Sequence, residues 1–139
     1  MRVLAVDYGD ARTGVALSDP TGLIAGEAFT IHEKNAAALV KTLCALCAER
    51  GVGRIVVGNP MHMNAGEGKR SEIARRIAER LGEASGLPVT LWDERLTSVD
   101  AHRILSESNR RGAKRRAAVD AVAASLILDG FLRAAGNTR

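Results

Sequence analysis

The strongest constraint on the fold is a change in the hydrophobic period of the chain near residue 34. Before this point, apolar residues recur with the period of about two that is typical of β-strands, over residues 2–8, 12–19 and 24–32. Gly9 and the Asp-Pro-Thr-Gly segment at 19–22 mark tight turns between these segments. Because such short turns join antiparallel neighbours, the sequence predicts a three-stranded antiparallel meander.

After residue 34 the period changes to about 3.6, and helical segments alternate with short apolar strands. Helices are predicted over residues 35–50, 69–84, 97–107 and 116–134, and strands over residues 54–58 and 89–93. Thr97 and Asp100 have the spacing of a capping box, which supports the third of these helices. Since helical crossovers join parallel strands, we predict a single α/β domain, residues 1–139, in which helices flank a mixed five-stranded sheet.

Composition narrows the class of protein. The chain has 139 residues, the usual size of one domain, and only four aromatic residues, so Val, Leu, Ile and Ala must fill its core. It has neither an apolar run of the roughly 18 residues that a membrane span needs nor a signal peptide, which predicts a cytoplasmic protein with no membrane partner. Cys44 and Cys47 lie in the middle of the helix predicted at 35–50, where packing is favoured over redox chemistry or zinc binding.

The positive charge is concentrated in one segment. The whole chain carries a formal charge of +4, whereas residues 95–118 hold seven Lys and Arg against two Asp and Glu, a local charge of +5. A solvated helix face is the alternative, but so one-sided a segment favours the phosphate backbone of a nucleic acid. The scarcity of aromatic residues disfavours base stacking as the main mode of binding. Nucleic-acid binding is therefore predicted for the basic residues Arg95, Lys114, Arg115 and Arg116.

Two carboxylates follow strands at positions where a packed α/β domain has no structural need for an acid. Asp7 closes the first strand on the same face as Val3 and Ala5, although a turn-forming role would also explain it. Glu94 follows the strand at 89–93 at its carboxyl end, the edge where open α/β sheets bind ligands. A solvated loop acid is the alternative for Glu94.

Asp120 is the most informative carboxylate, because it lies on the apolar stripe of the last predicted helix. At helical spacing its neighbours on this stripe are Ala117, Ala123, Ala124, Ile127 and Phe131. A buried carboxylate is costly unless its charge is compensated, so either a metal ion or an arginine must lie against Asp120. The small alanines would let this helix approach the sheet and bring Asp120 near the strand ends. Asp129, in contrast, fits a surface position on the same helix.

Three carboxylates from separate elements suit hard divalent cations, which prefer oxygen ligands, so Mg²⁺ or Mn²⁺ is the predicted cofactor. In phosphodiester cleavage, two such ions about 4 Å apart would activate water and stabilise the leaving oxygen. Asp7, Glu94 and Asp120 are therefore predicted to be the metal ligands and catalytic residues of a hydrolytic nuclease.

These residues belong to a set of motifs that spans almost the whole chain. The motifs are D-Y-G-x-x-R-x-G-V-A-x-S-D at 7–19, V-G-x-P at 57–60, E-G at 67–68, D-E-R-L-T at 93–97 and K-R-R-x-x-V-D-x-x-A-A-x-x-I-L at 114–128. In this order they resemble the YqgF family of bacteria, also called RuvX. The resemblance implies an RNase H-like fold related to the RuvC resolvase and a nuclease that matures the precursor of 16S ribosomal RNA. Resolution of Holliday junctions is an older suggestion for the family.

Carried over position by position, the resemblance implies that the acidic triad of the family is Asp7, Glu94 and Asp120. Arg12 matches the turn arginine of the family, where it would orient Asp7 or meet a phosphate. The chain departs from the family pattern at Asp10 and Ala11, where Thr and Lys are common, at Asn59, which replaces an apolar residue, and at Asn64-Ala65-Gly66, which replaces Asp-Gly-Ser. The first and last departures could alter the grip on substrate, and none touches the predicted metal ligands.

The leading hypothesis is a Mg²⁺- or Mn²⁺-dependent endonuclease that processes precursor rRNA, as a monomer or homodimer, in association with the maturing ribosome. One alternative is a Holliday junction resolvase of DNA recombination and repair, which normally needs a dimer to cut two strands symmetrically. Another is a non-cleaving RNA-binding factor of ribosome assembly. Phosphotransfer of the actin and sugar-kinase kind needs two such lobes around the nucleotide, and 139 residues supply only one.

Overall fold

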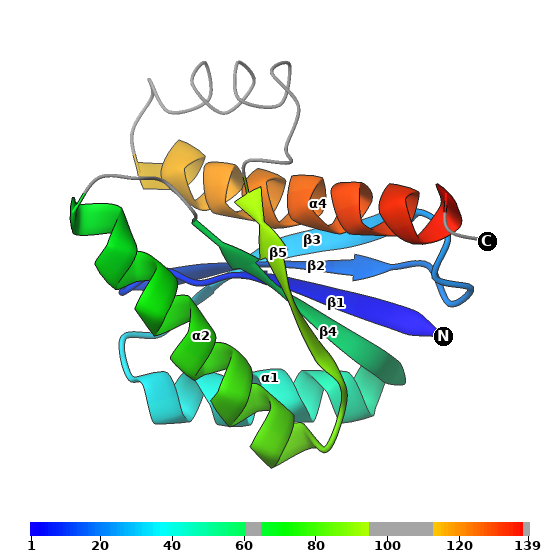
Figure 1. The fold of residues 1–139 in the computed structure, drawn as a ribbon, viewed down its shortest axis with the longest axis horizontal. Helices are drawn as coiled ribbons and strands as arrows, with labels where there is room; N and C mark the ends of the chain where they lie inside the picture. Colours follow the sequence, from blue (N-terminus) through cyan, green and yellow to red (C-terminus); the bar gives the residue numbers. More distant parts are fainter. Residues whose placement is uncertain (61–64, 95–112, 138–139) are drawn as a thin grey trace.

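The computed structural model describes residues 1–60, 65–94 and 113–137 of the chain. Five strands form one mixed sheet in the order β3-β2-β1-β4-β5, with helices packed against it (Figure 1). The strands are β1 (Arg2–Asp7), β2 (Arg12–Ser18), β3 (Ala25–His32), β4 (Val52–Asn59) and β5 (Val89–Asp93). The described helices are α1 (Ala36–Arg50), α2 (Ala65–Ser85) and α4 (Ala113–Asn137). The predicted α/β fold with a mixed five-stranded sheet is confirmed.

The strand directions follow the predicted connections. β1 lies at the centre of the sheet, antiparallel to β2 and parallel to β4, while β3 pairs antiparallel with β2 and β5 pairs in parallel with β4. The meander at the beginning of the chain is therefore followed by two parallel crossovers. As a result, the carboxyl ends of β1, β4 and β5 meet at one edge of the sheet, where Asp7 of β1 pairs with Gly14 of β2.

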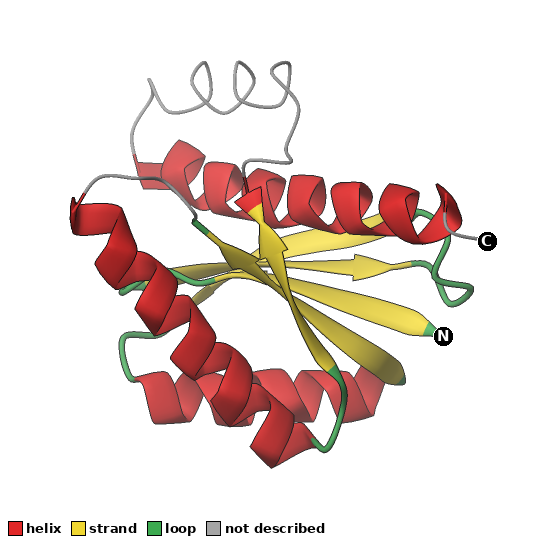
Figure 2. Cartoon of the chain, in the orientation of Figure 1, coloured by secondary structure: helices red, strands yellow, loops and turns green. Residues whose placement is uncertain are grey.

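Helices α1 and α2 cover one face of the sheet, and α4 covers the other (Figure 2). Alternation along β1 decides which side chains face which helix. Leu4 and Val6 belong to the larger hydrophobic core under α1 and α2, whereas Val3 and Ala5 belong to the smaller core under α4. The sequence pattern thus already separates the two faces.

The ends of α1 are fixed by its cap residues. The side chain of Asn35 accepts a hydrogen bond from the Ala38 N–H at 2.9 Å, and Gly51 ends the helix with a φ of 65°, which glycine adopts without strain. Within this helix Cys47 is buried and Cys44 half-buried, and both thiols are free. Burial, with a smaller contribution from Cys44, raises the pKa of Cys47 to about 11. The prediction that these cysteines serve packing is confirmed.

Two helices extend beyond their predicted bounds. α2 begins at Ala65 rather than near residue 69, so its first turn includes Gly66 and Gly68, although each of these glycines disfavours a helix by about 1 kcal/mol. α4 covers Ala113–Asn137 rather than 116–134. The helix predicted at 97–107, with its capping box, lies outside the described residues. None of the described helices is both long and apolar enough to cross a lipid bilayer.

Candidate active site

The predicted acids of β1 and β5 meet because parallel strands end at the same edge of the sheet. Asp7 is the last residue of β1, on the α4 face that it shares with Val3 and Ala5, and Glu94 directly follows β5. Gly58 of β4 lies between them, since β4 is paired with both β1 and β5. A Cβ atom at Gly58 would lie 3.0 Å from Glu94 Oε1, so this glycine leaves the room that the Glu94 carboxyl group occupies.

The carboxyl groups of Asp7 and Glu94 are hydrogen-bonded to each other. Burial raises the pKa of Asp7 well above its ordinary value of 3.8, and the charge of Glu94, this hydrogen bond and the charge of Asp120 raise it further. Arg70 of α2 acts in the opposite direction. Two acids so placed resist ionising together, and either a retained proton or a cation relieves their repulsion.

Asp120 reaches the same edge from α4, on the face of the sheet that Asp7 shares, through a close contact between α4 and β2. A Cβ atom at Gly14 would overlap the backbone carbonyl oxygen of Asp120, so the helix backbone rests directly on that glycine. Because Gly14 is the register partner of Asp7, this contact brings Asp120 to Asp7. The alanines predicted to let α4 approach the sheet are therefore not sufficient. The close approach also requires a glycine at position 14 of β2.

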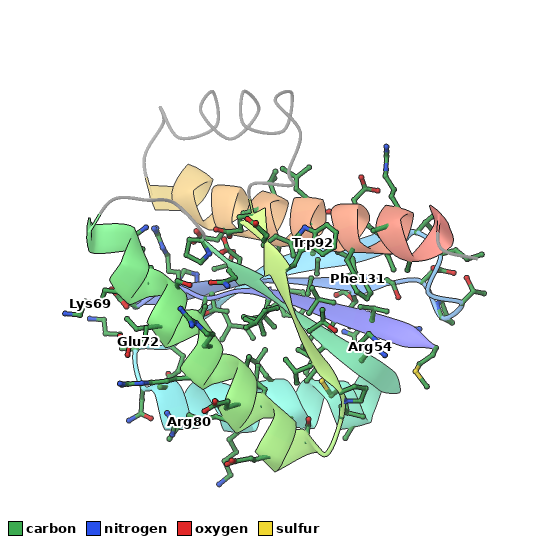
Figure 3. All side chains as sticks on the ribbon, in the orientation of Figure 1. Arg54, Lys69, Glu72, Arg80, Trp92 and Phe131 are labelled. Carbon is green, nitrogen blue, oxygen red and sulfur yellow. The ribbon has the colours of Figure 1, made fainter. Side chains whose placement is uncertain are left out.

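A ring contact fixes α4 across β5 farther along the helix. Trp92 of β5 and Phe131 of α4 meet edge to face, with ring centroids 6.0 Å apart and ring planes at 88° (Figure 3). A Cβ atom at Gly130 would lie 3.3 Å from the Trp92 ring, so a glycine at this point lets the indole pack against the helix. The helix that carries Asp120 is therefore positioned by contacts with both β2 and β5.

Arg12, the first residue of β2, compensates the charge of Asp120. Its Nε atom lies 3.2 Å from Asp120 Oδ2. Oδ2 is nevertheless buried without a hydrogen-bond partner in the described part of the molecule, so the arginine satisfies its charge but not its hydrogen-bonding capacity. Burial raises the pKa of Asp120, and Arg12 and His32 oppose the rise. Of the two partners expected for Asp120, a metal ion or an arginine, the structure shows the arginine.

The three acids line a single cavity of about 610 Å³. Its lining is formed by Asp7, Tyr8, Gly9, Asp10, Gly58, Pro60, Lys69, Arg70, Ile73, Ala74, Glu94 and Asp120. Lys69 and Arg70 are exposed residues near the beginning of α2, and Figure 3 shows Lys69 projecting from that helix. Sequence reasoning missed both bases. The available signal was their place in the sequence just after Gly66 and Gly68, which follow the end of the strand predicted at 54–58.

The basic residues predicted to bind nucleic acid are largely outside the described part of the molecule. Arg95 lies outside the described residues, and Lys114, Arg115 and Arg116 lie in the first turn of α4 with side chains that are not described. Within the described segments, no group of three His, Cys, Asp or Glu side chains is arranged as a metal site. The three acids thus share a cavity, and Asp120 is also ion-paired with Arg12.

Comparison with solved structures defines the class of the fold. RuvC of Thermus thermophilus in complex with a Holliday junction substrate matches with a TM-score of 0.65 at 10% identity, over 96% of each chain. The Fowlpox virus resolvase in complex with Holliday junction DNA matches with a TM-score of 0.58 at 10% identity, over 97% of this chain and 99% of the viral one. The architecture is that of the RuvC-like, RNase H-like nucleases.

Sequence comparison then identifies the family. The model of the RuvX family, described as Holliday junction resolvase, matches residues 1–134. A protein of Pelotomaculum thermopropionicum named "Putative pre-16S rRNA nuclease" is 44% identical over 140 aligned positions, which cover 100% of this chain and 91% of that protein. A protein of Clostridium novyi with the same name is 42% identical, over 95% of this chain and 98% of its own length. The chain belongs to the RuvX family, and its relatives and fold are those of nucleases.

Proposed function

We propose that this protein is a divalent-metal-dependent endonuclease that hydrolyses phosphodiester bonds at the 5′ side of the 16S rRNA precursor. The observation that carries the proposal is the convergence of Asp7, Glu94 and Asp120 on one cavity that also contains Lys69 and Arg70. The names of the relatives at 42–44% identity support the choice of substrate. Maturation of a ribosomal precursor would take place in the cytoplasm.

The acids of the cavity fit a divalent cation by their chemistry. Asp7 and Glu94 offer carboxylate oxygens, the ligands that Mg²⁺ and Mn²⁺ prefer, and their mutual repulsion is what a cation between them would relieve. When bound there, such an ion supplies a water activated for attack and charge stabilisation at the leaving oxygen. Asp120, with its buried Oδ2 lacking a hydrogen bond among the described residues, is the third ligand once Arg12 releases it.

The basic residues of the cavity act on the substrate rather than on the metal. Lys69 and Arg70 stand on the α2 side and Arg12 on the β2 side, so cations flank the acids in two directions. They would hold phosphates of the strand on either side of the bond to be cut, which keeps that bond beside the carboxylates. The basic residues Arg95, Lys114, Arg115 and Arg116 are proposed to bind the nucleic acid farther from the cavity.

The proposal is tested by cleavage of a 5′-extended 16S precursor with Mg²⁺ or Mn²⁺. Asp7→Asn keeps the size of the side chain but removes its charge, and it should reduce the cleavage rate about 10²–10³-fold, the range for loss of one preorganised charge in an active site. Asp129→Asn is the matched control, because Asp129 lies on α4 in a surface ion pair with Arg133 and should leave the rate unchanged. Equal activity of wild type and Asp7→Asn would contradict the assignment of Asp7.

Metal binding is measured separately by calorimetry with Mn²⁺. Wild type should bind the ion at millimolar concentration or tighter, and Asp7→Asn more weakly. An absence of binding to wild type would favour the non-cleaving RNA-binding factor instead, since the proposed cleavage needs the ion to activate water.

A second candidate function is resolution of Holliday junctions, which is favoured by the description of the family model. Symmetric cutting of two strands normally requires two active sites related by a dimer axis. The test is the cleavage of a four-way DNA junction together with the mass of the complex in solution. Monomers on the junction, or cuts on one strand only, would rule this function out.

A further inference from the structure

A second cavity lies beside the candidate active site, and Arg12 is the one residue of its lining that has a part in the function proposed above. Its volume is about 640 Å³, and it is lined by Ala11, Arg12, His32, Glu33, Lys34 and Asn35. These residues come from the start of β2, the end of β3 and the segment before α1. A backbone hydrogen bond from the Glu33 N–H to the Ala11 carbonyl, at 3.1 Å, joins its two sides.

Arg12 connects this cavity to the active site. It lines the second cavity, while its Nε atom contacts Asp120, which lines the first. His32 is the register partner of Arg12 across β2 and β3, so its side chain belongs to the same edge of the sheet. A strand that passes over Asp120 therefore meets Arg12 and then the second cavity.

The side chains of this cavity suit an anion. Arg12 and Lys34 are cations, His32 offers a ring N–H donor, and Glu33 is the one acid in the lining. His32 and Lys34 are exposed, and neither has an ion-pair partner among the described residues. Lys34 thus remains available to a ligand from solution. With no Phe, Tyr or Trp among the described residues of the lining, the cavity suits a phosphate group better than a stacked base.

We propose that the cavity between β2, β3 and α1 is a phosphodiester subsite, in which His32 and Lys34 hold the backbone of the nucleic acid next to the bond that is cut. This inference rests on the proposed nuclease function. It adds the path of the bound strand, which would run from Lys69 and Arg70 across the acids to His32 and Lys34. The ligand class is a single strand of RNA or DNA, recognised through its phosphates.

The experiment compares Lys34→Ala with Lys41→Ala in the full chain. Lys41 is an exposed residue of α1 outside the cavity, so Lys41→Ala removes the same positive charge from the protein but not from the cavity. Binding of fluorescein-labelled single-stranded RNA and DNA is measured by anisotropy in EDTA, where cleavage is prevented, over a range of salt concentrations. Thermal melts check that both variants are folded.

We expect Lys34→Ala to weaken binding about 3- to 10-fold at low salt and to reduce the slope of log K against log salt by about one, while Lys41→Ala changes neither. His32→Ala should weaken binding in the same direction. In cleavage assays with the precursor RNA, Lys34→Ala should raise KM and leave kcat unchanged. A difference between the RNA and DNA arms identifies which strand the subsite takes.

Equal affinities of Lys34→Ala and Lys41→Ala, for both RNA and DNA, would overturn the subsite. This failure is distinct from failure of the proposed function. If wild type cleaves the precursor but Lys34→Ala does so with an unchanged KM, the subsite alone is wrong. If wild type cleaves nothing but Lys34→Ala still binds more weakly than Lys41→Ala, the subsite stands and the proposed cleavage is wrong.

Discussion

The two faces of the sheet bury side chains of different size, and the difference separates stability from positioning. Under α1 and α2 the core consists mainly of Leu, Ile and Val, with Leu39 and Leu43 fully buried. Under α4 the core is smaller and includes Ala5 and Ala124, and the helix rests on Gly14, which has no side chain. Large side chains fill the face under α1 and α2, whereas small residues on the other face let the backbone of α4 approach the backbone of β2.

Close approach on the α4 face has an energetic cost. It brings Asp7, Glu94 and Asp120 together, and burial raises the pKa of Asp7 and of Asp120. The larger face offsets this cost, since burial of one Leu side chain contributes about 1.5–3 kcal/mol. The site can therefore be electrostatically strained because the opposite face of the same sheet supplies the stability.

The largest effect is expected on the α1 face. Leu43→Ala removes a fully buried side chain and should lower the free energy of unfolding by about 2–5 kcal/mol, measured by urea denaturation. The cleavage rate per folded molecule should not change, because Leu43 lies on the face away from the acids. A comparable loss of rate would show that the two faces are not separate in function.

Gly14→Ala addresses the α4 face. The new Cβ would overlap the Asp120 carbonyl oxygen, so α4 must shift, which we expect to cost about 1–3 kcal/mol of stability. The shift displaces Asp120, and cleavage should fall about 10²-fold. Gly136→Ala is the control: a Cβ there meets nothing within 4 Å, and the variant should be as stable as wild type or slightly more so. Unchanged cleavage by Gly14→Ala would contradict the role given to this contact.

The dependence of stability on pH tests the strain at Asp7. A carboxyl group whose pKa is raised on folding stabilises the protein fully below its unfolded pKa, here about 3.8, and this contribution is lost as pH rises through the folded pKa. In EDTA, Asp7→Asn should therefore gain stability relative to wild type as pH rises above about 3.8 and until pH passes the raised pKa of Asp7, by about 1.4 kcal/mol for each unit by which the pKa is raised. A difference that is constant with pH would show that Asp7 is not strained.

The smallest effect is expected for Asp129→Asn. Asp129 forms an exposed i,i+4 ion pair with Arg133, with an Nε–Oδ2 distance of 2.9 Å, and such pairs contribute about 0.3–0.5 kcal/mol. Asp120 and Asp129 belong to the same helix, but only Asp120 faces the sheet. Comparing variants of the two residues therefore shows how much the position of a carboxylate on the helix matters for stability. A loss above about 1 kcal/mol, measured by urea denaturation, would mean that surface charge on α4 also positions the helix.

Much of the fold was predictable because it depends on local pattern. Alternation in residues 2–8 placed Asp7 on the face of Val3 and Ala5, and parallel connections brought Glu94 to the same edge. Helical spacing placed Asp120 on the stripe of Ala124 and Ile127, which are buried between α4 and the sheet. The three acids were therefore identified from sequence, and the structure brings them to one cavity.

The sequence by itself determined the order of the elements, the face of each strand and the three acids, because hydrophobic period and strand direction are properties of short segments. The tertiary structure alone decided that Arg12 contacts Asp120 rather than Asp7, and that Lys69 and Arg70 line the acidic cavity. These contacts join residues far apart in the chain, and they depend on where α4 rests on Gly14 and where α2 passes the end of β4. No local pattern records the position of such a crossing, because it is set by how closely two backbones can pack.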